Sequence, residues 1–280
     1  MAAKFPQPIS TMVTKPSNKA RASRNPRETL GFCLGIVLVG ALIQLFGTLK
    51  GDALVFPGVD VILRAFGNLI VDPHTWVLVG TSLRHLILSM MIATFVGLII
   101  GMAEGLSCFI RALFRPLMNL LRSIPMIVLV VIIMVLMPYP RVPVTASSLI
   151  LIPIISEAAS EGCQRIEPEL IDVYRLNSGL NPRILTRVYL PLMAGYLRQA
   201  WVNAAGMGLR LAISTEYLVQ TRDSLGKAIY SSSYFNEYQD IYAYALIMIL
   251  LVLLIGEAPS WINRTVSFFL RDRSGIDLCH

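Results

Sequence analysis

Five stretches of the chain contain no charged side chain, and their lengths predict a set of apolar helices. The stretches cover residues 30–49, 86–103, 124–137, 142–156 and 241–255. A helix that crosses the hydrocarbon core of a bilayer needs about 20 predominantly apolar residues, and several of the stretches reach or approach this length. The pattern therefore predicts an all-α polytopic membrane protein.

Polar segments between these stretches divide the chain into six predicted spans. We place them at about residues 30–49, 76–103, 117–137, 144–162, 188–219 and 241–269. The fifth span is long enough to tilt, or to bend at Gly206-Met207-Gly208. The domain organisation follows from these spans. A polar tail covers residues 1–29, and an extracytoplasmic segment covers residues 50–75. The transmembrane core, residues 76–270, includes the charged stretch 164–187, and a second tail covers residues 271–280.

Composition supports a membrane environment. Of the 280 residues, 55% are hydrophobic and 15% are charged, whereas about 25% of the residues of a soluble domain are charged. The net charge of +7 does not indicate nucleic-acid binding, because the basic residues flank the predicted spans. The segments richest in Arg and Lys are the two tails, the turn near Arg111 and the stretch 164–187, so the positive-inside rule places all of them, and both termini, in the cytosol.

The amino-terminal tail carries no recognisable cleavable signal, because the first apolar stretch lacks a small-residue cleavage site. We interpret residues 1–29 as a mobile cytosolic tail before an uncleaved first span. A lipid-binding amphipathic arm is the alternative, but its prolines and few apolar residues disfavour it.

No catalytic or metal-binding pattern stands out. The four cysteines include no C-x-x-C pair, and the three histidines form no H-E-x-x-H. The sequence also lacks the G-x-x-x-x-G-K-[ST] loop that binds nucleotide phosphates. We therefore expect a non-catalytic chain with no cofactor of its own.

The most informative polar segment is the stretch 164–187. Ile166-Glu167-Pro168 is a typical helix start, with an acidic residue and a proline in the first turn. A short helix with an apolar side follows, and Ser178-Gly179 ends it. A short amphipathic helix between two long spans is suited to docking in a groove on a soluble partner.

The stretch resembles the coupling loop of type I ABC importer permeases, written E-A-A-x(3)-G-x(9)-I-x-L-P. When Val188-Tyr189-Leu190-Pro191 is aligned with I-x-L-P, the E-A-A position falls on Asp172-Val173-Tyr174 and the glycine position on Ser178. The acid is kept as Asp, and both small residues are replaced by larger ones. Glu157-Ala158-Ala159 spells the same letters, but the spacing to Gly162 is one residue too short.

Other motifs, over roughly residues 55–265, resemble the branch of that family that imports sulfonates, taurine and nitrate. They are Phe56-Pro57, Val61-Ile62, His74-Thr75-Trp76, Thr81-Ser82-Leu83-Arg84, the glycines Gly97, Gly101 and Gly105, Arg115-Pro116, Leu121-Arg122-Ser123-Ile124-Pro125, Ile166-Glu167-Pro168 and Glu216. Each motif is weak alone; the resemblance depends on their order and spacing.

The resemblance implies a multi-pass subunit of the bacterial inner membrane that pairs with a second permease copy. Two cytosolic ATPase subunits would bind ATP and Mg, and an extracytoplasmic binding protein would deliver the solute. The residues that would contact the ATPase are Glu167, Glu169, Asp172, Val173, Tyr174, Leu176, Asn177, Ser178 and Gly179. The bulky Val173 and Tyr174 predict a roomier cleft on that ATPase.

Candidate residues of the translocation pathway are Arg84, Ser123, Pro125, Arg210 and Glu216. Ionisable groups at membrane depth are costly and usually face protein or a water-filled path. Arg210 in the pathway would favour an anionic solute; the alternative is an internal pair with Glu216 or snorkelling to the interface. Ser123 and Pro125 either shape the path or mark a static kink.

Three local contacts are expected. Gly97, Gly101 and Gly105 share one helix face and should permit close packing within the subunit, in preference to a seam between copies. Glu157 should pair with a nearby arginine, as should Glu161 four residues later on the same helix face. His85, beside Arg84, is expected at the membrane interface.

Two other functions are compatible with a polytopic chain. A stand-alone ion-coupled carrier would show inverted repeats with carboxylates near the midplane, and neither is evident. A structural or signalling subunit could dock a partner through the stretch 164–187. Within the leading interpretation, a pyrimidine or thiamine precursor is the alternative cargo.

Overall fold

The structure is a computed structural model that describes residues 57–166 and 189–273, with the isolated residues 34, 35, 38, 41 and 55; side chains are described as far as Ile255. The chain divides into two compact units, Met1–Phe56 and Pro57–His280. In the first unit, residues 34, 35, 38 and 41 are helical. The predicted amino-terminal tail, most of the first span, residues 167–187 of the coupling stretch and residues 274–280 of the second tail lie outside the described residues.

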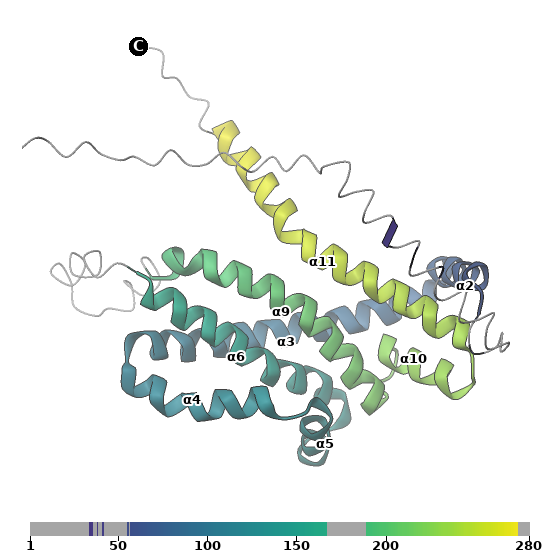
Figure 1. The fold of residues 1–280 in the computed structure, drawn as a ribbon, viewed down its shortest axis with the longest axis horizontal. Coiled ribbons are helices and arrows are strands. Elements are labelled where there is room, and N and C mark those ends of the chain that lie inside the picture. Colours follow the sequence, from purple (N-terminus) through teal and green to yellow (C-terminus); the bar gives the residue numbers. More distant parts are fainter. Residues whose placement is uncertain are drawn as a thin grey trace, which may run out of the picture. The chain divides into compact units, whose positions relative to one another are not determined.

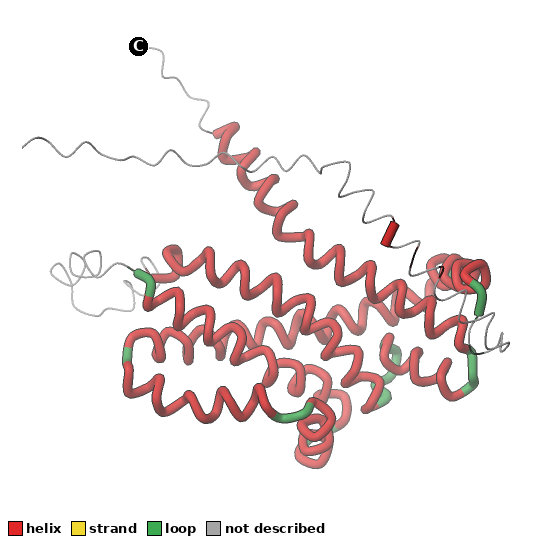
Figure 2. The backbone as a smooth tube through the Cα atoms, in the orientation of Figure 1, coloured by secondary structure: helices red, strands yellow, loops and turns green. Residues whose placement is uncertain are grey.

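The described part of the second unit is built from helices and short turns, with no strand in residues 57–166 or 189–273 (Figure 2). The predicted all-α fold class is confirmed. In chain order the helices are α2 (Val59–Val71), α3 (Pro73–Leu106), α4 (Cys108–Ser123), α5 (Met126–Leu136), the short 3-10 helix η1 (Tyr139–Arg141), α6 (Val142–Gln164), α9 (Leu190–Val219), α10 (Leu225–Tyr234) and α11 (Tyr238–Arg273).

The core lies where α3, α6 and α9 pack together (Figure 1). Gly97, Gly101 and Gly105 of α3 all face α6, as predicted. A side chain added at Gly97 would lie 2.9 Å from the Cβ of Ile155, and one added at Gly101 would collide with the backbone carbonyl of Ser156. The glycines therefore let the two helix backbones approach closely, within one subunit.

The predicted third span, 117–137, is not one helix. It comprises the second half of α4 and all of α5, which meet at an angle of 103°. Ile124 adopts an extended conformation with φ −68° and ψ 126°, as a residue before proline is biased to do. Pro125 has no backbone N–H to continue the α4 ladder, so the chain changes direction at this elbow.

Two helices lie in segments that the sequence pattern assigns to polar loops. The extracytoplasmic segment 50–75 contains the whole of α2, and the loop 220–240 contains α10. Conversely, α9 runs without interruption through Gly206-Met207-Gly208 and ends at Gln220, which has φ 55°. The fifth predicted span is therefore one continuous helix, with no break at Gly206-Met207-Gly208.

Three helical segments of the described chain are long and apolar enough to cross a membrane, or four if the bent α4–α5 pair counts as one span. They are Pro73–Leu106, Tyr139–Gln164 and Tyr238–Ile255. The polytopic class is thus supported. The count of six stays a prediction, because most of the first span lies outside the described residues and α9 carries Arg198, Arg210 and Glu216.

Candidate functional site

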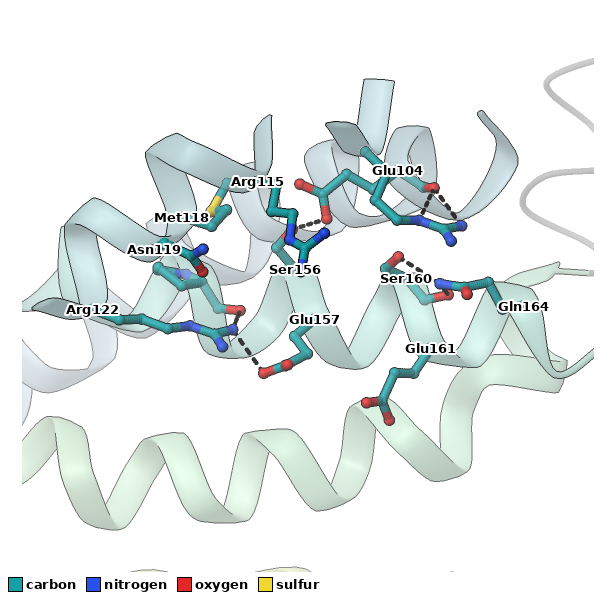
Figure 3. Close-up of a pocket in the computed structure, with 12 residues that line it drawn as sticks. Glu104, Arg115, Met118, Asn119, Arg122, Ser156, Glu157, Ser160, Glu161 and Gln164 are labelled. Carbon is teal, nitrogen blue, oxygen red and sulfur yellow. Dashed lines mark hydrogen bonds and ion pairs between the residues drawn. The ribbon is translucent and has the colours of Figure 1, made fainter. Parts of the chain in front are cut away.

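A polar cleft of about 470 Å³ lies between α4 and α6 and reaches the end of α3 (Figure 3). Its volume falls within the range of small-molecule sites. Three acids and three arginines line it together with six other residues: Glu104, Arg111, Arg115, Met118, Asn119, Arg122, Pro153, Ser156, Glu157, Ser160, Glu161 and Gln164. The ionisable side chains of the cleft therefore carry balanced charge.

Two of the arginines hold α4 in place. Arg111 donates from Nε and Nη2 to the backbone carbonyl of Glu104, at 3.1 and 2.9 Å. Arg122 donates from Nη2 to the carbonyl of Pro153 at 2.9 Å and to Oε2 of Glu157 at 2.7 Å. The expected pairing of Glu157 with an arginine is confirmed. These bonds tie α4 to the end of α3 and to the middle of α6.

The Glu104 carboxyl group lies at the inner wall of the cleft. The residue is only 7% exposed, and Ser156 Oγ donates to Oε2 at 3.3 Å. The other oxygen, Oε1, is buried and has no hydrogen-bond partner among the described residues. A buried acceptor without a donor is costly, so a hydrogen-bond donor at this carboxyl group would be stabilising.

Arg115 and Glu161 also line the cleft, and both are exposed. Within residues 57–166 and 189–255 neither side chain makes a hydrogen bond or an ion pair. The expected arginine pair of Glu161 is therefore not seen in this part of the chain. Figure 3 shows Glu104, Arg115 and Glu157 arranged around the same opening.

A second polar cluster surrounds Glu216 of α9. The residue is 0% exposed, and its carboxylate accepts from Ser82 Oγ at 2.7 Å and from the backbone N–H of Gly226 at 3.2 Å. His85 Nδ1 lies 2.8 Å from the other carboxylate oxygen. Ser82 Oγ accepts in turn from the N–H of Leu225 at 3.1 Å.

The cluster fastens the start of α10 to α3 and α9. Gly226 lies so close to α9 that an added side chain would collide with Glu216 and with the carbonyl of Ile213. Ser224 caps α10 by accepting from the N–H of Lys227 at 3.3 Å. The first N–H groups of α10 therefore all have partners, and a buried carboxylate lies at its N-terminus, where negative charge is favoured.

Comparison with known proteins identifies the family. The profile of the family described as "Binding-protein-dependent transport system inner membrane component" matches residues 93–271, which run from the middle of α3 to the end of α11. The chain belongs to this family. It is therefore an importer permease of the binding-protein-dependent ABC type, and it lies in the inner membrane.

Two solved structures share the permease fold. Both are described as inward-facing conformations of the MetNI methionine ABC transporter, in a native and a selenomethionine-soaked crystal form. The first has a TM-score of 0.54 and 23% identity, and the second has 0.59 and 20%; each alignment covers 70% of this chain and 98% of that chain. A search of curated protein sequences gave no significant match.

The predicted pathway residues of the permease differ in their exposure within one subunit. Arg84, Arg210, Ser123 and Pro125 are all exposed, whereas Glu216 is buried. The internal pair of Arg210 with Glu216 is not seen among the described residues; Glu216 instead contacts His85. His85 of α3 is 4% exposed and its side chain faces α9, so it is buried in the protein; its depth in the membrane stays a prediction.

The predicted coupling residues of the permease, from Glu167 to Gly179, lie outside the described residues. The structure does show the helices on either side: α6 ends at Gln164 and α9 begins at Leu190. The stretch therefore joins two helices that pack against each other.

Sequence reasoning missed two features of the site. Glu104 escaped notice because it stands alone at the end of an apolar helix. The signal for the cleft was the spacing of Arg111, Arg115 and Arg122, which lie at i, i+4 and i+11 on one helix face. The cluster around Glu216 had no such signal, because its members come from separate helices.

Proposed function

We propose that this permease forms the translocation pathway for a small anionic solute of the sulfonate, taurine or nitrate kind. A second copy of the chain completes the pathway, and two cytosolic ATPase subunits drive it. The observation that carries the proposal is the family match over residues 93–271, which includes both the core helices and the predicted coupling stretch. The extracytoplasmic binding protein selects the solute.

Exposed arginines support the anionic character of the solute. Arg84 of α3 and Arg210 of α9 are exposed in the single subunit, and an arginine that faces lipid at membrane depth is costly. A second permease copy or a water-filled path would cover them at lower cost. Guanidinium groups in such a path would attract sulfonate, nitrate or carboxylate ions.

Nucleotide chemistry must come from the partner subunits, because the sequence contains no phosphate-binding loop. ATP and Mg would bind there, and each coupling helix would transmit closure of the ATPases to α6 and α9. Asp172, Tyr174 and Leu176 are the residues of the stretch that we expect to enter the ATPase cleft. The large Val173 and Tyr174 would require a wider cleft than small residues do.

Co-purification with a co-expressed cytosolic ATPase tests the coupling role. The double variant Tyr174→Asp, Leu176→Asp buries charge in the proposed contact, and we expect it to retain about tenfold less ATPase than the wild type. The control, Tyr234→Asp, Phe235→Asp, places the same charges on an exposed aromatic pair at the end of α10. It should retain the ATPase fully.

Reconstituted transport separates the proposal from an ion-coupled carrier. Proteoliposomes that contain the permease, the ATPase and the binding protein should transport solute only when ATP is supplied on the side of the membrane where the ATPase lies. Uptake driven by an ion gradient without any ATPase, or full ATPase retention by the coupling variant, would contradict the proposal. Thermal-shift screening of the binding protein with sulfonates, nitrate and pyrimidines would then identify the cargo.

A further inference from the structure

Among the described residues, three charged side chains of the cleft between α4 and α6 have an unfilled hydrogen-bonding group: Glu104, Arg115 and the exposed Glu161. Glu104 Oε1 is buried without a hydrogen-bond donor among the described residues. Arg115 makes no hydrogen bond or ion pair in the same part of the chain, whereas Arg111 and Arg122 are both engaged. Glu104 is therefore the buried acid of the cleft with an unfilled acceptor, and Arg115 is the arginine with unfilled donors.

We propose that this cleft binds a small zwitterion, with its ammonium group on Glu104 and its acid group on Arg115. This inference rests on the proposed function, since it makes the cleft a solute subsite of the permease. It also specifies that the solute carries an ammonium group as well as its acid group. An ammonium group presents three N–H donors for the Glu104 carboxylate. A guanidinium group binds a carboxylate or sulfonate with two parallel hydrogen bonds.

Charge balance in the cleft favours a zwitterion over a simple ion. A bare anion near Arg115 would also face the carboxylates of Glu104, Glu157 and Glu161, which line the same space. A bare cation near Glu104 would face the three arginines of α4. Only a ligand that carries both charges, a few bonds apart, meets an opposite charge at each end.

The cleft also has the size and position for a solute subsite. Its volume of about 470 Å³ accommodates a ligand with a few heavy atoms together with water. Its α6 wall ends at Gln164, immediately before the stretch that we expect to contact the ATPase. A ligand in the cleft would thus contact the helix that leads into the coupling stretch.

Radioligand binding to the full-length permease in lipid nanodiscs tests the inference with a matched set of probes. β-Alanine carries both charges, 3-hydroxypropionate carries only the acid, and 3-aminopropan-1-ol carries only the ammonium. We expect saturable binding of labelled β-alanine, with competition by each singly charged analogue about tenfold weaker, since a charged hydrogen bond contributes that much.

The variants assign each charge to its residue. In Glu104→Gln, β-alanine and 3-hydroxypropionate should bind with about equal affinity. In Arg115→Gln, β-alanine and 3-aminopropan-1-ol should bind with about equal affinity. These are ratios within one preparation, so a partial loss of folded protein does not change them. Glu237→Gln and Arg222→Gln alter exposed residues outside the cleft and should keep the wild-type ratios.

The inference is overturned if wild type shows no saturable β-alanine binding, or if Glu104→Gln keeps the wild-type preference. Retention of the ATPase, measured on the same preparations, separates this failure from failure of the proposed function. A wild type that retains the ATPase but does not bind β-alanine contradicts only the cleft. A wild type that does not retain any ATPase contradicts the coupling role, whatever the cleft binds.

Discussion

At the scale of single residues, two carboxylates with charged partners are expected to differ greatly in their contribution to stability. Glu216 is fully buried and has three polar partners, one of them His85. Glu157 pairs with Arg122, but the two side chains are 55% and 40% exposed. Water screens the second pair and can replace either partner, whereas nothing replaces Glu216 once it is removed.

Replacing Glu216 with Ala should therefore destabilise the permease strongly. The change leaves His85, Ser82 and the N–H of Gly226 buried without their acceptor, and breaking such a network costs about 3–5 kcal/mol. Glu216→Gln, which retains one acceptor oxygen, should cost less. Unfolding of the detergent-solubilised protein, followed by intrinsic fluorescence against denaturant, measures both losses. An alanine variant as stable as wild type would show that the cluster does not hold α10.

Replacing Glu157 with Gln provides the comparison. Because the pair with Arg122 is exposed on both sides, we expect a loss of at most about 1 kcal/mol in the same unfolding measurement. The Arg122 bond to the carbonyl of Pro153 is retained in this variant. A loss as large as that of Glu216→Ala would mean that the α4–α6 contact, and not the α10 anchor, dominates stability.

At the scale of helices, the contact of α3 with α6 depends on glycine at particular positions. An added side chain at Gly101 would collide with the carbonyl of Ser156 and lie 2.6 Å from the Cβ of Ala159. At Gly80, on the same helix, an added side chain has nothing within 4 Å. The same substitution at the two sites therefore separates packing from helix propensity.

Gly101→Ala should destabilise the permease by about 1–3 kcal/mol, because the helices must separate to admit the methyl group. Gly80→Ala should be neutral or stabilising by up to about 1 kcal/mol, since alanine favours the helix. Thermal unfolding of both variants in one detergent measures the difference. Equal loss at the two sites would contradict the close approach of α3 and α6.

The helices also show how far the sequence pattern reaches. The pattern predicts α3, α6, α9 and α11 to within a few residues because apolar length is a local property. It predicts a kink at Pro125 but not a turn of 103°, since the angle depends on how α5 packs on α6. It misses α10, whose N–H groups are satisfied by Ser82 and Glu216 from other helices.

The same limit explains the site residues. Arg84 and His85 are neighbours in sequence, but on a helix they face different directions, so one is exposed and the other is buried beside Glu216. The helical periodicity of the sequence could place Arg84 and His85 on different helix faces. It could not identify Glu216 as the partner of His85. Glu104, by contrast, is the only acid in α3, and a lone acid at the end of an apolar helix is a signal that sequence reading could use.

At the scale of the whole molecule, contacts between helix ends constrain the membrane orientation. The start of α3 and the end of α9 lie together, because Ser82 and Glu216 both bind α10. The end of α3, with α4 and the end of α6, forms the other side, where Arg111, Arg115 and Arg122 gather. The α10 side instead mixes Arg222 and Lys227 with Asp223 and Glu237. From the positive-inside rule we therefore expect α10 outside and the α4–α6 cleft on the cytosolic side.

Reporter fusions test this orientation. Alkaline phosphatase folds only outside the cytosol, so its fusion after Asp223, just before α10, should be active. A fluorescent protein fused after His280 should be bright, because it matures in the cytosol. The two fusion sites are separated by one membrane crossing, that of α11. The two reporters should therefore report opposite sides of the membrane, and each result checks the other. A silent phosphatase with a dark carboxyl-terminal fusion would reverse the orientation, place the cleft outside, and remove the coupling stretch from reach of any cytosolic ATPase.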